Sequence, residues 1–243
     1  MKKIAVIDCG TNTFNLLVVE ATKEGWTPLF TNKVAVKLGE GGFDDKVIRR
    51  DRFARGLDAL LVHHTAVQSL QCDEVFAFAT SALREASNGS EFVAKAAHLF
   101  GLQIELISGD REAELIWEGV RLSMDIGTEP ALIMDIGGGS TEFIIADKRR
   151  TYWKMSFDIG ASRLLEIFSP DDPICAAQVK QLEKYLLKEI APLTAALRDY
   201  PVTLLVGASG SSESYARMIG YHLHGKDPLR GKAHYTFDLQ AYH

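Results

Sequence analysis

The 243-residue chain has few cysteines, no long apolar run and no excess of positive charge. Its three cysteines, Cys9, Cys72 and Cys175, lie far apart without metal-binding spacing, which favours a reducing cytoplasm over a disulfide framework. The first apolar run ends at Asp8 and is too short for a signal peptide or a membrane span. The net charge of −5 argues against a general binder of nucleic acid or of a membrane surface. We therefore expect a cytoplasmic protein that binds any anionic ligand through a local site.

The remaining composition is typical of a globular α/β protein. Hydrophobic residues make up 47% of the chain and charged residues 24%. Strands are expected at residues 4–7, 14–20, 33–38, 75–80, 103–107, 131–134, 143–146 and 203–206. Helices are expected at residues 45–71, 88–100, 110–124, 174–200 and 212–219, with a kink or a break at Pro192. Alternating strands and helices indicate α/β layers, and a boundary near residue 126 predicts two domains, residues 1–126 and 127–243.

One short pattern occurs twice. Each copy is an apolar strand, a turn of the form Asp-x-Gly-x-x-Thr/Ser and a second apolar strand. We call residues 8–13 the first turn and residues 135–140 the second turn. The matched pairs are Asp8 with Asp135, Gly10 with Gly137, and Thr13 with Ser140. A repeat at this distance indicates duplicated domains.

The residue types in the two turns suit a phosphate site. Glycine lets the backbone approach an anion closely, and successive N–H groups with a hydroxyl form a nest for phosphate oxygens. The aspartate that precedes each nest cannot bind phosphate, but it can hold Mg²⁺, so Asp8 and Asp135 are candidate metal ligands. The alternative is a plain tight hairpin with a turn-initiating aspartate, and the second copy weighs against it. A dinucleotide-binding turn is excluded because a strand, not a helix, follows each turn.

Five motifs in this order resemble the exopolyphosphatase / guanosine pentaphosphate phosphohydrolase family, within the superfamily of acetate kinase, sugar kinases, heat-shock chaperones and actin. They are Asp8-Cys9-Gly10-Thr11-Asn12-Thr13, Lys37-Leu38-Gly39-Glu40-Gly41, Ala79-Thr80-Ser81-Ala82-Leu83-Arg84-Glu85-Ala86, Ile107-Ser108-Gly109-Asp110-Arg111-Glu112-Ala113 and Asp135-Ile136-Gly137-Gly138-Gly139-Ser140-Thr141-Glu142. The weaker segment Gly160-Ala161-Ser162-Arg163-Leu164 also looks like the family.

The resemblance implies an α/β protein of two ribonuclease H-like, actin-like domains with mixed five-stranded sheets and an active site in the inter-domain cleft. It implies an acid anhydride hydrolase that uses Mg²⁺ to release orthophosphate from polyphosphate or guanosine pentaphosphate, and a homodimer is a further family expectation. Family members continue beyond the point that corresponds to His243, so the second domain is expected to be incomplete at its C-terminus.

The candidate site residues have three roles. The phosphate-binding candidates are Gly10, Thr11, Asn12, Thr13, Arg84, Gly137, Gly138, Gly139, Ser140 and Thr141. The resemblance makes Glu112 the catalytic base, and the alternative is a carboxylate that complements a helix dipole. Glu142 would position water or contact the metal, or it would be a solvent-facing strand residue. Arg84 would clamp phosphate oxygens, or it would be a surface arginine at a helix start.

Several points stay open at this level. Arg163 is equally a phosphate contact or a structural residue, and Cys9 is expected to pack beneath the first turn. Asn15 stands where the family usually has a basic residue, which weakens one phosphate contact. The role of residues 207–211 is undetermined. The rival functions are a non-catalytic polyphosphate or alarmone sensor and a small-molecule kinase of the same superfamily.

Overall fold

A computed structural model of the chain describes residues 1–241. By contacts it divides into two compact units that interleave along the sequence. Unit 1 comprises Met1–Gly109, Gly137–Ser140 and Ile159–Gln178, and unit 2 comprises Asp110–Ile136, Thr141–Asp158 and the residues from Val179 onward. Because the units interleave, they do not test a boundary between continuous domains at residue 126.

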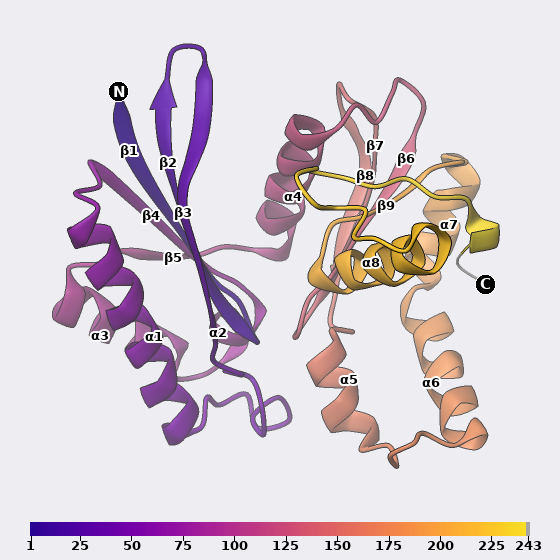
Figure 1. Ribbon diagram of the computed structural model, residues 1–243. Coiled ribbons are helices and arrows are strands. Elements are labelled where there is room, and N and C mark those ends of the chain that lie inside the picture. Colours follow the sequence, from indigo (N-terminus) through magenta and orange to yellow (C-terminus); the bar gives the residue numbers. More distant parts are fainter. Residues whose placement is uncertain (242–243) are drawn as a thin grey trace. The chain divides into compact units, whose positions relative to one another are not determined.

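Unit 1 contains a five-stranded mixed sheet in the order β3-β2-β1-β4-β5 (Figure 1). Its strands are β1 (Lys2–Cys9), β2 (Thr13–Thr22), β3 (Gly25–Ala35), β4 (Glu74–Ala79) and β5 (Ile104–Leu106). The first three strands are antiparallel neighbours, and β4 runs parallel to both β1 and β5. This is the mixed five-stranded sheet expected of a ribonuclease H-like domain.

Helices α1 (Arg50–Ser69) and α3 (Gly89–Phe100) cover one face of this sheet, and the short α2 (Ser81–Glu85) follows β4 (Figure 1). Every second residue of β1, namely Ala5, Ile7 and Cys9, points into their common core, as the period of a strand requires. Phe14 and Phe92 lie edge to face in this core, with ring centroids 6.2 Å apart. Burial of side chains of this size stabilises the fold by about 1.5–3 kcal/mol each.

Unit 2 is built on a four-stranded sheet in the order β8-β7-β6-β9, which corrects the expectation of five strands for the described residues. Its strands are β6 (Ala131–Ile136), β7 (Thr141–Ala146), β8 (Thr151–Phe157) and β9 (Leu205–Gly207). Helix α4 (Gly109–Ser123) packs on this sheet, because its residues Ala113 and Val120 share one apolar cluster with Ile133 and Ile144.

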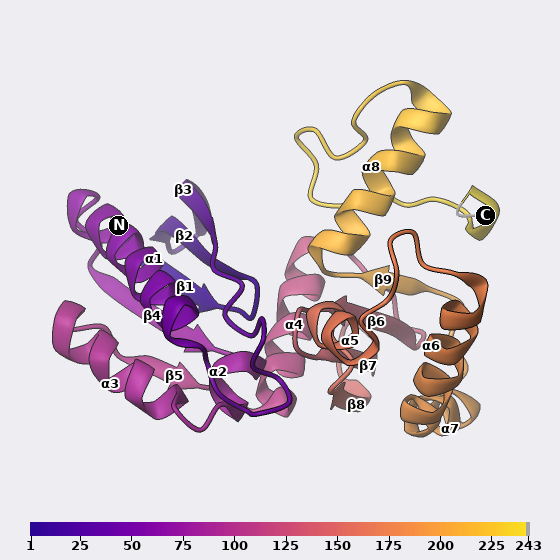
Figure 2. The ribbon, with the colours of Figure 1, turned by 90° about the horizontal axis from the view of Figure 1, so that it is seen from below.

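The remaining helices are α5 (Ala161–Phe168), α6 (Ala176–Glu189), α7 (Ala191–Asp199) and α8 (Gly210–His224). Figure 2 shows that α8 follows directly from the edge strand β9. The expected break at Pro192 is confirmed, since Pro192 lies in the first turn of α7, where its missing N–H costs no helical hydrogen bond. No helix among residues 1–241 is long and apolar enough to cross a membrane.

Candidate functional site

The first turn joins β1 to β2 through a tight backbone link. The N–H of Gly10 donates to the carbonyl of Thr13 at 3.1 Å. The carbonyl of Thr11 accepts a hydrogen bond from the N–H of Leu38 at 2.6 Å. The carbonyl of Asn12 accepts from the N–H groups of Val36 at 2.8 Å and Lys37 at 3.0 Å, in the segment after β3. Those carbonyls therefore face the segment after β3, which fixes the path of the turn. Beneath the turn, Cys9 is buried as expected, and burial raises the pKa of its thiol.

Asp8 lies near the end of β1 and is exposed to solvent. Desolvation by the surrounding protein raises the pKa of its carboxyl, although the Asn15 amide, which donates to Oδ2 at 3.0 Å, and the charge of Lys33 act in the opposite direction. A partly desolvated but accessible carboxylate suits a hard divalent cation, which would offset the desolvation cost. Asn15 therefore contacts the metal candidate, whereas a basic residue was the family expectation for a phosphate contact.

The second turn repeats the geometry of the first. The N–H of Gly137 donates to the carbonyl of Ser140 at 3.0 Å, the same four-residue link that closes the first turn. A Cβ atom added to Gly10 would lie 3.0 Å from the Thr13 carbonyl oxygen, and one added to Gly137 would lie 3.0 Å from that of Ser140. The repeat seen in the sequence is therefore also a repeat of local structure.

Within unit 1, the glycines of the second turn lie directly against the first turn. A Cβ atom on Gly138 would approach the Asn12 amide nitrogen to 2.8 Å, closer than real Cβ contacts. One on Gly139 would lie 2.9 Å from the Thr11 hydroxyl and 2.3 Å from that of Ser81. A side chain at either position would force the side chains of Asn12, Thr11 or Ser81 to move, because they fill the space next to these glycines.

The acidic candidates of the second turn lie in unit 2. Asp135 on β6 and Glu142 on β7 are directly opposite each other, and Ser156 on β8 is opposite Glu142. Directly paired residues share one face of a sheet, so the three side chains form a row across three strands. Glu142 is only 1% exposed, and its Oε1 accepts a hydrogen bond from the Ser156 hydroxyl at 2.7 Å. Its reading as a solvent-facing strand residue is therefore wrong.

Glu112 lies in the first turn of α4, also in unit 2. Lys154 of β8 holds this turn in place, because its ammonium donates to the Asp110 carbonyl at 3.2 Å and pairs with the carboxylate of Glu114. Lys154 is two residues from Ser156 and hence on the same face of the sheet. The helix turn that carries Glu112 is thus anchored on the face that carries the row of Asp135, Glu142 and Ser156.

Arg84 lies in the last turn of α2, in unit 1. One guanidinium nitrogen donates to the carbonyl of Ile107 at 3.1 Å, and the side chain is half-buried rather than fully exposed. That bond uses one of the five N–H donors of the guanidinium, and it holds the side chain at the end of the parallel strands. The role of Arg84 as a phosphate clamp stays a prediction.

Among residues 1–241, no group of three or more His, Cys, Asp or Glu side chains converges in a way that would hold a metal ion by itself. Mg²⁺ does not need such a cage, since it commonly takes one or two carboxylates together with waters and substrate phosphates. Asp8 in unit 1 and Asp135 in unit 2 each supply a carboxylate of the kind that such an ion takes. The magnesium site remains a prediction.

Comparisons with known proteins agree with these features. The model of the Ppx/GppA phosphatase family matches residues 17–234. The chain belongs to the Ppx/GppA phosphatase family. An exopolyphosphatase of Cytophaga hutchinsonii superposes with a TM-score of 0.92 at 35% identity, over 95% of this chain and 74% of that one. The PPX-GPPA enzyme of Aquifex aeolicus superposes with a TM-score of 0.75 at 25% identity, over 94% of this chain and 74% of that one.

The family match confirms the resemblance expected from the motifs, and the two mixed sheets agree with the expected α/β class. A third relative, an exopolyphosphatase-like protein, has a TM-score of 0.81 at 25% identity over 90% of this chain and 69% of that one. The roles of individual residues in the reaction stay predictions.

Sequence reasoning left out several residues that organise this Ppx/GppA site. Ser81 and Glu85 were recognised as part of a motif but received no role, and Ser162 was noted only within the weaker family segment. All three contact either the second turn or the residues that hold it. Since their partners are distant in sequence, only the family motifs could have marked them, residues 79–86 for Ser81 and Glu85 and residues 160–164 for Ser162.

Proposed function

We propose that this chain is an exopolyphosphatase-type phosphohydrolase. It would release terminal orthophosphate from inorganic polyphosphate, guanosine pentaphosphate or both. The observation that carries the proposal is the close contact of the two glycine turns in unit 1, where Gly138 and Gly139 lie against Asn12 and Thr11. Two nests of N–H and hydroxyl donors side by side suit a chain of linked phosphates better than a single small anion.

In this proposal the turn amides, the hydroxyls of Thr13 and Ser140 and the guanidinium of Arg84 hold the phosphate oxygens. Glu112 takes a proton from the attacking water, and Glu142 orients that water. Mg²⁺, held by Asp8 and Asp135, would neutralise negative charge on the phosphates. Phosphoryl transfer depends mainly on positioning and charge stabilisation, which is what a site rich in rigid donors supplies.

The test is an assay of orthophosphate release over a panel of substrates, with and without Mg²⁺. The panel contains polyphosphates of several lengths, guanosine pentaphosphate and ATP. Release from polyphosphate or the pentaphosphate that requires Mg²⁺ is the expected result. Binding of either compound without release would instead indicate a sensor, and ATP-dependent phosphorylation of a small hydroxylated compound without polyphosphate hydrolysis would indicate a kinase.

The base is tested by Glu112→Gln. This variant should lose turnover but still bind polyphosphate, because the amide keeps the size of the side chain and cannot accept the proton of water. Glu118→Gln is the matched control, since Glu118 lies on the same helix, is exposed and pairs with Arg121 at 2.7 Å. The control should keep its activity. Wild-type turnover in Glu112→Gln would refute the assignment.

A further inference from the structure

The first turn of α5 is attached to the second turn by backbone hydrogen bonds. The N–H groups at the start of a helix have no partner within it. Here those of Ala161 and Ser162 donate to the carbonyls of Gly137 and Gly138, both at 2.9 Å, and the N–H of the capping residue Gly160 donates to Gly139 at 3.2 Å. The carbonyls of three successive residues of the second turn therefore point at the start of α5.

This attachment also sets the direction of the amides in the second turn. In a trans peptide the C=O and the following N–H point to opposite sides. When the carbonyls of Gly137, Gly138 and Gly139 face α5, the N–H groups of Gly138, Gly139 and Ser140 face away from it. Several N–H groups aligned in one direction form an anion-binding nest. Helix α5 thus orients the donors that the proposed function assigns to phosphate.

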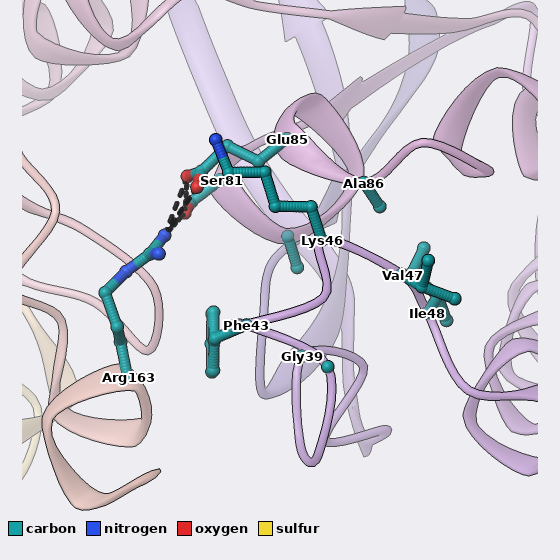
Figure 3. A pocket seen from close by; sticks show the side chains of 11 residues that line it. Gly39, Phe43, Lys46, Val47, Ile48, Ser81, Glu85, Ala86 and Arg163 are labelled. Carbon is teal, nitrogen blue, oxygen red and sulfur yellow. Dashed lines mark hydrogen bonds and ion pairs between the residues drawn. The ribbon is translucent and has the colours of Figure 1, made fainter. Parts of the chain in front are cut away.

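The side chain of Arg163 adds a second connection. Its Nε donates to the carbonyl of Gly139 at 2.8 Å, and its Nη2 donates to both carboxylate oxygens of Glu85, at 2.8 and 2.7 Å. Figure 3 shows the guanidinium pointing at Glu85 and Ser81, with Phe43 beside it. The guanidinium carbon lies 4.7 Å from the centroid of the Phe43 ring, and Arg163 is 8% exposed. A buried arginine with these partners is held in one orientation.

Two further side chains of α5 reach the loops of unit 1. The hydroxyl of Ser162 donates to the Asn12 side-chain oxygen at 2.8 Å, which links α5 to the first turn. The carboxylate of Glu166 accepts from the N–H groups of Gly41 at 2.7 Å and Phe43 at 3.1 Å. The eight-residue helix therefore contacts both turns and the glycine-rich loop that follows β3.

From these contacts we propose that α5 holds the second turn in register with the first, and that Arg163 and Ser162 are positioning residues. Arg163 acts through the Gly139 carbonyl and Glu85. This inference rests on the proposed function only for its effect on turnover, since the contacts themselves are independent of the reaction. It decides between the two readings of Arg163 in favour of a structural role.

The test compares Arg163→Met, Arg163→Lys, Glu85→Gln and the double variant Arg163→Met/Glu85→Gln. The control is Arg121→Met, which removes an exposed arginine that forms an ion pair within α4. The readouts are hydrogen exchange at residues 160–162, whose amides donate to the second turn, thermal unfolding, and kcat and KM for polyphosphate. Hydrogen exchange needs no turnover, so it tests the positioning role even if the protein hydrolyses none of the substrates.

Exchange at residues 160–162 should be at least about tenfold faster in Arg163→Met than in the wild type, with little change in β1. Arg163→Lys should behave similarly, because an ammonium lacks the planar fork that reaches Gly139 and Glu85 together. Glu85→Gln should reproduce part of the loss, and the double variant should be no worse than Arg163→Met alone. The control should match the wild type.

Three outcomes would overturn the inference. Unchanged exchange at residues 160–162 in folded Arg163→Met would show that the arginine does not hold the turn. Recovery of KM in Arg163→Lys while exchange stays fast would indicate a direct charge contact with phosphate. Additive losses in the double variant would mean that Arg163 and Glu85 act separately.

Discussion

Gly160 provides the sharpest test of how the two turns are held, and the perturbation is Gly160→Ala. Gly160 caps α5 with φ −66° and ψ 154°, an extended conformation that alanine adopts without strain. Any effect must therefore come from the added methyl group. A Cβ atom there would lie 2.4 Å from the carbonyl carbon of Gly139, and 2.5 Å from both the carbonyl carbon and the carbonyl oxygen of Gly138.

These contacts allow an estimate of the size of the effect. The optimal separation of two non-bonded carbon atoms is about 3.5–4.0 Å, so the second turn must move away from α5 by about 1 Å. The atoms in the way are backbone, which cannot rotate aside, and overpacking of this kind costs about 1–3 kcal/mol of stability. A displacement of about 1 Å in a positioning element can lower turnover by about a hundredfold. Both losses are expected in Gly160→Ala.

The assay measures orthophosphate release and thermal unfolding in Gly160→Ala and in Gly119→Ala. Gly119 is a glycine of α4 at which an added Cβ meets no atom within 4 Å. Its replacement should leave turnover unchanged and should stabilise the helix by about 0.5–1 kcal/mol. Wild-type turnover and unfolding temperature in Gly160→Ala would refute the close approach of α5 to the second turn.

Two further predictions concern buried polar groups. His63 is fully buried, with Nε2 3.2 Å from the Phe14 carbonyl oxygen, and burial lowers the pKa of its imidazole. Below about pH 6.5 the imidazole of His63 binds a proton in the unfolded chain but resists it in the folded state, so the free energy of unfolding should decrease as the pH is lowered. The decrease should be smaller in His63→Gln, which lacks this imidazole, than in His64→Gln, which keeps it. A urea titration at several pH values checks this, and equal slopes in the two variants would contradict it. Ser156→Ala removes a donor from the buried Glu142 carboxylate and should cost about 1.5–3 kcal/mol in thermal unfolding, whereas an unchanged unfolding temperature would show that the hydrogen bond contributes nothing.

Most strands could be read from the sequence, including the edge strands β5 and β9, but the edge strands β3 and β8 were predicted only in part or not at all. Strand β3 was expected only from residue 33, but it begins at Gly25. Its first residues are exposed, so no alternation marks them, and Pro28 is tolerated because the strand lies at the edge of the sheet. The edge strand β8 was missed because its residues are mostly half-buried and show no alternation of buried and exposed positions. Helix α1 was expected from residue 45 but begins at Arg50, because residues 45–49 belong to the preceding loop.

The sequence by itself was sufficient to identify the family of this protein and to predict the chemistry of its site. The Asp-x-Gly-x-x-Thr/Ser repeat, Glu112 and the ordered motifs were sufficient to predict phosphate binding and the family, because a turn that accepts an anion needs particular residues at adjacent positions. The tertiary structure alone decided which residues organise the turns. Arg163 contacts Glu85 and Gly139 across 78 and 24 residues of sequence, and Ser162 contacts Asn12 across 150. Such contacts depend on how distant segments pack, and no local pattern in the chain encodes them.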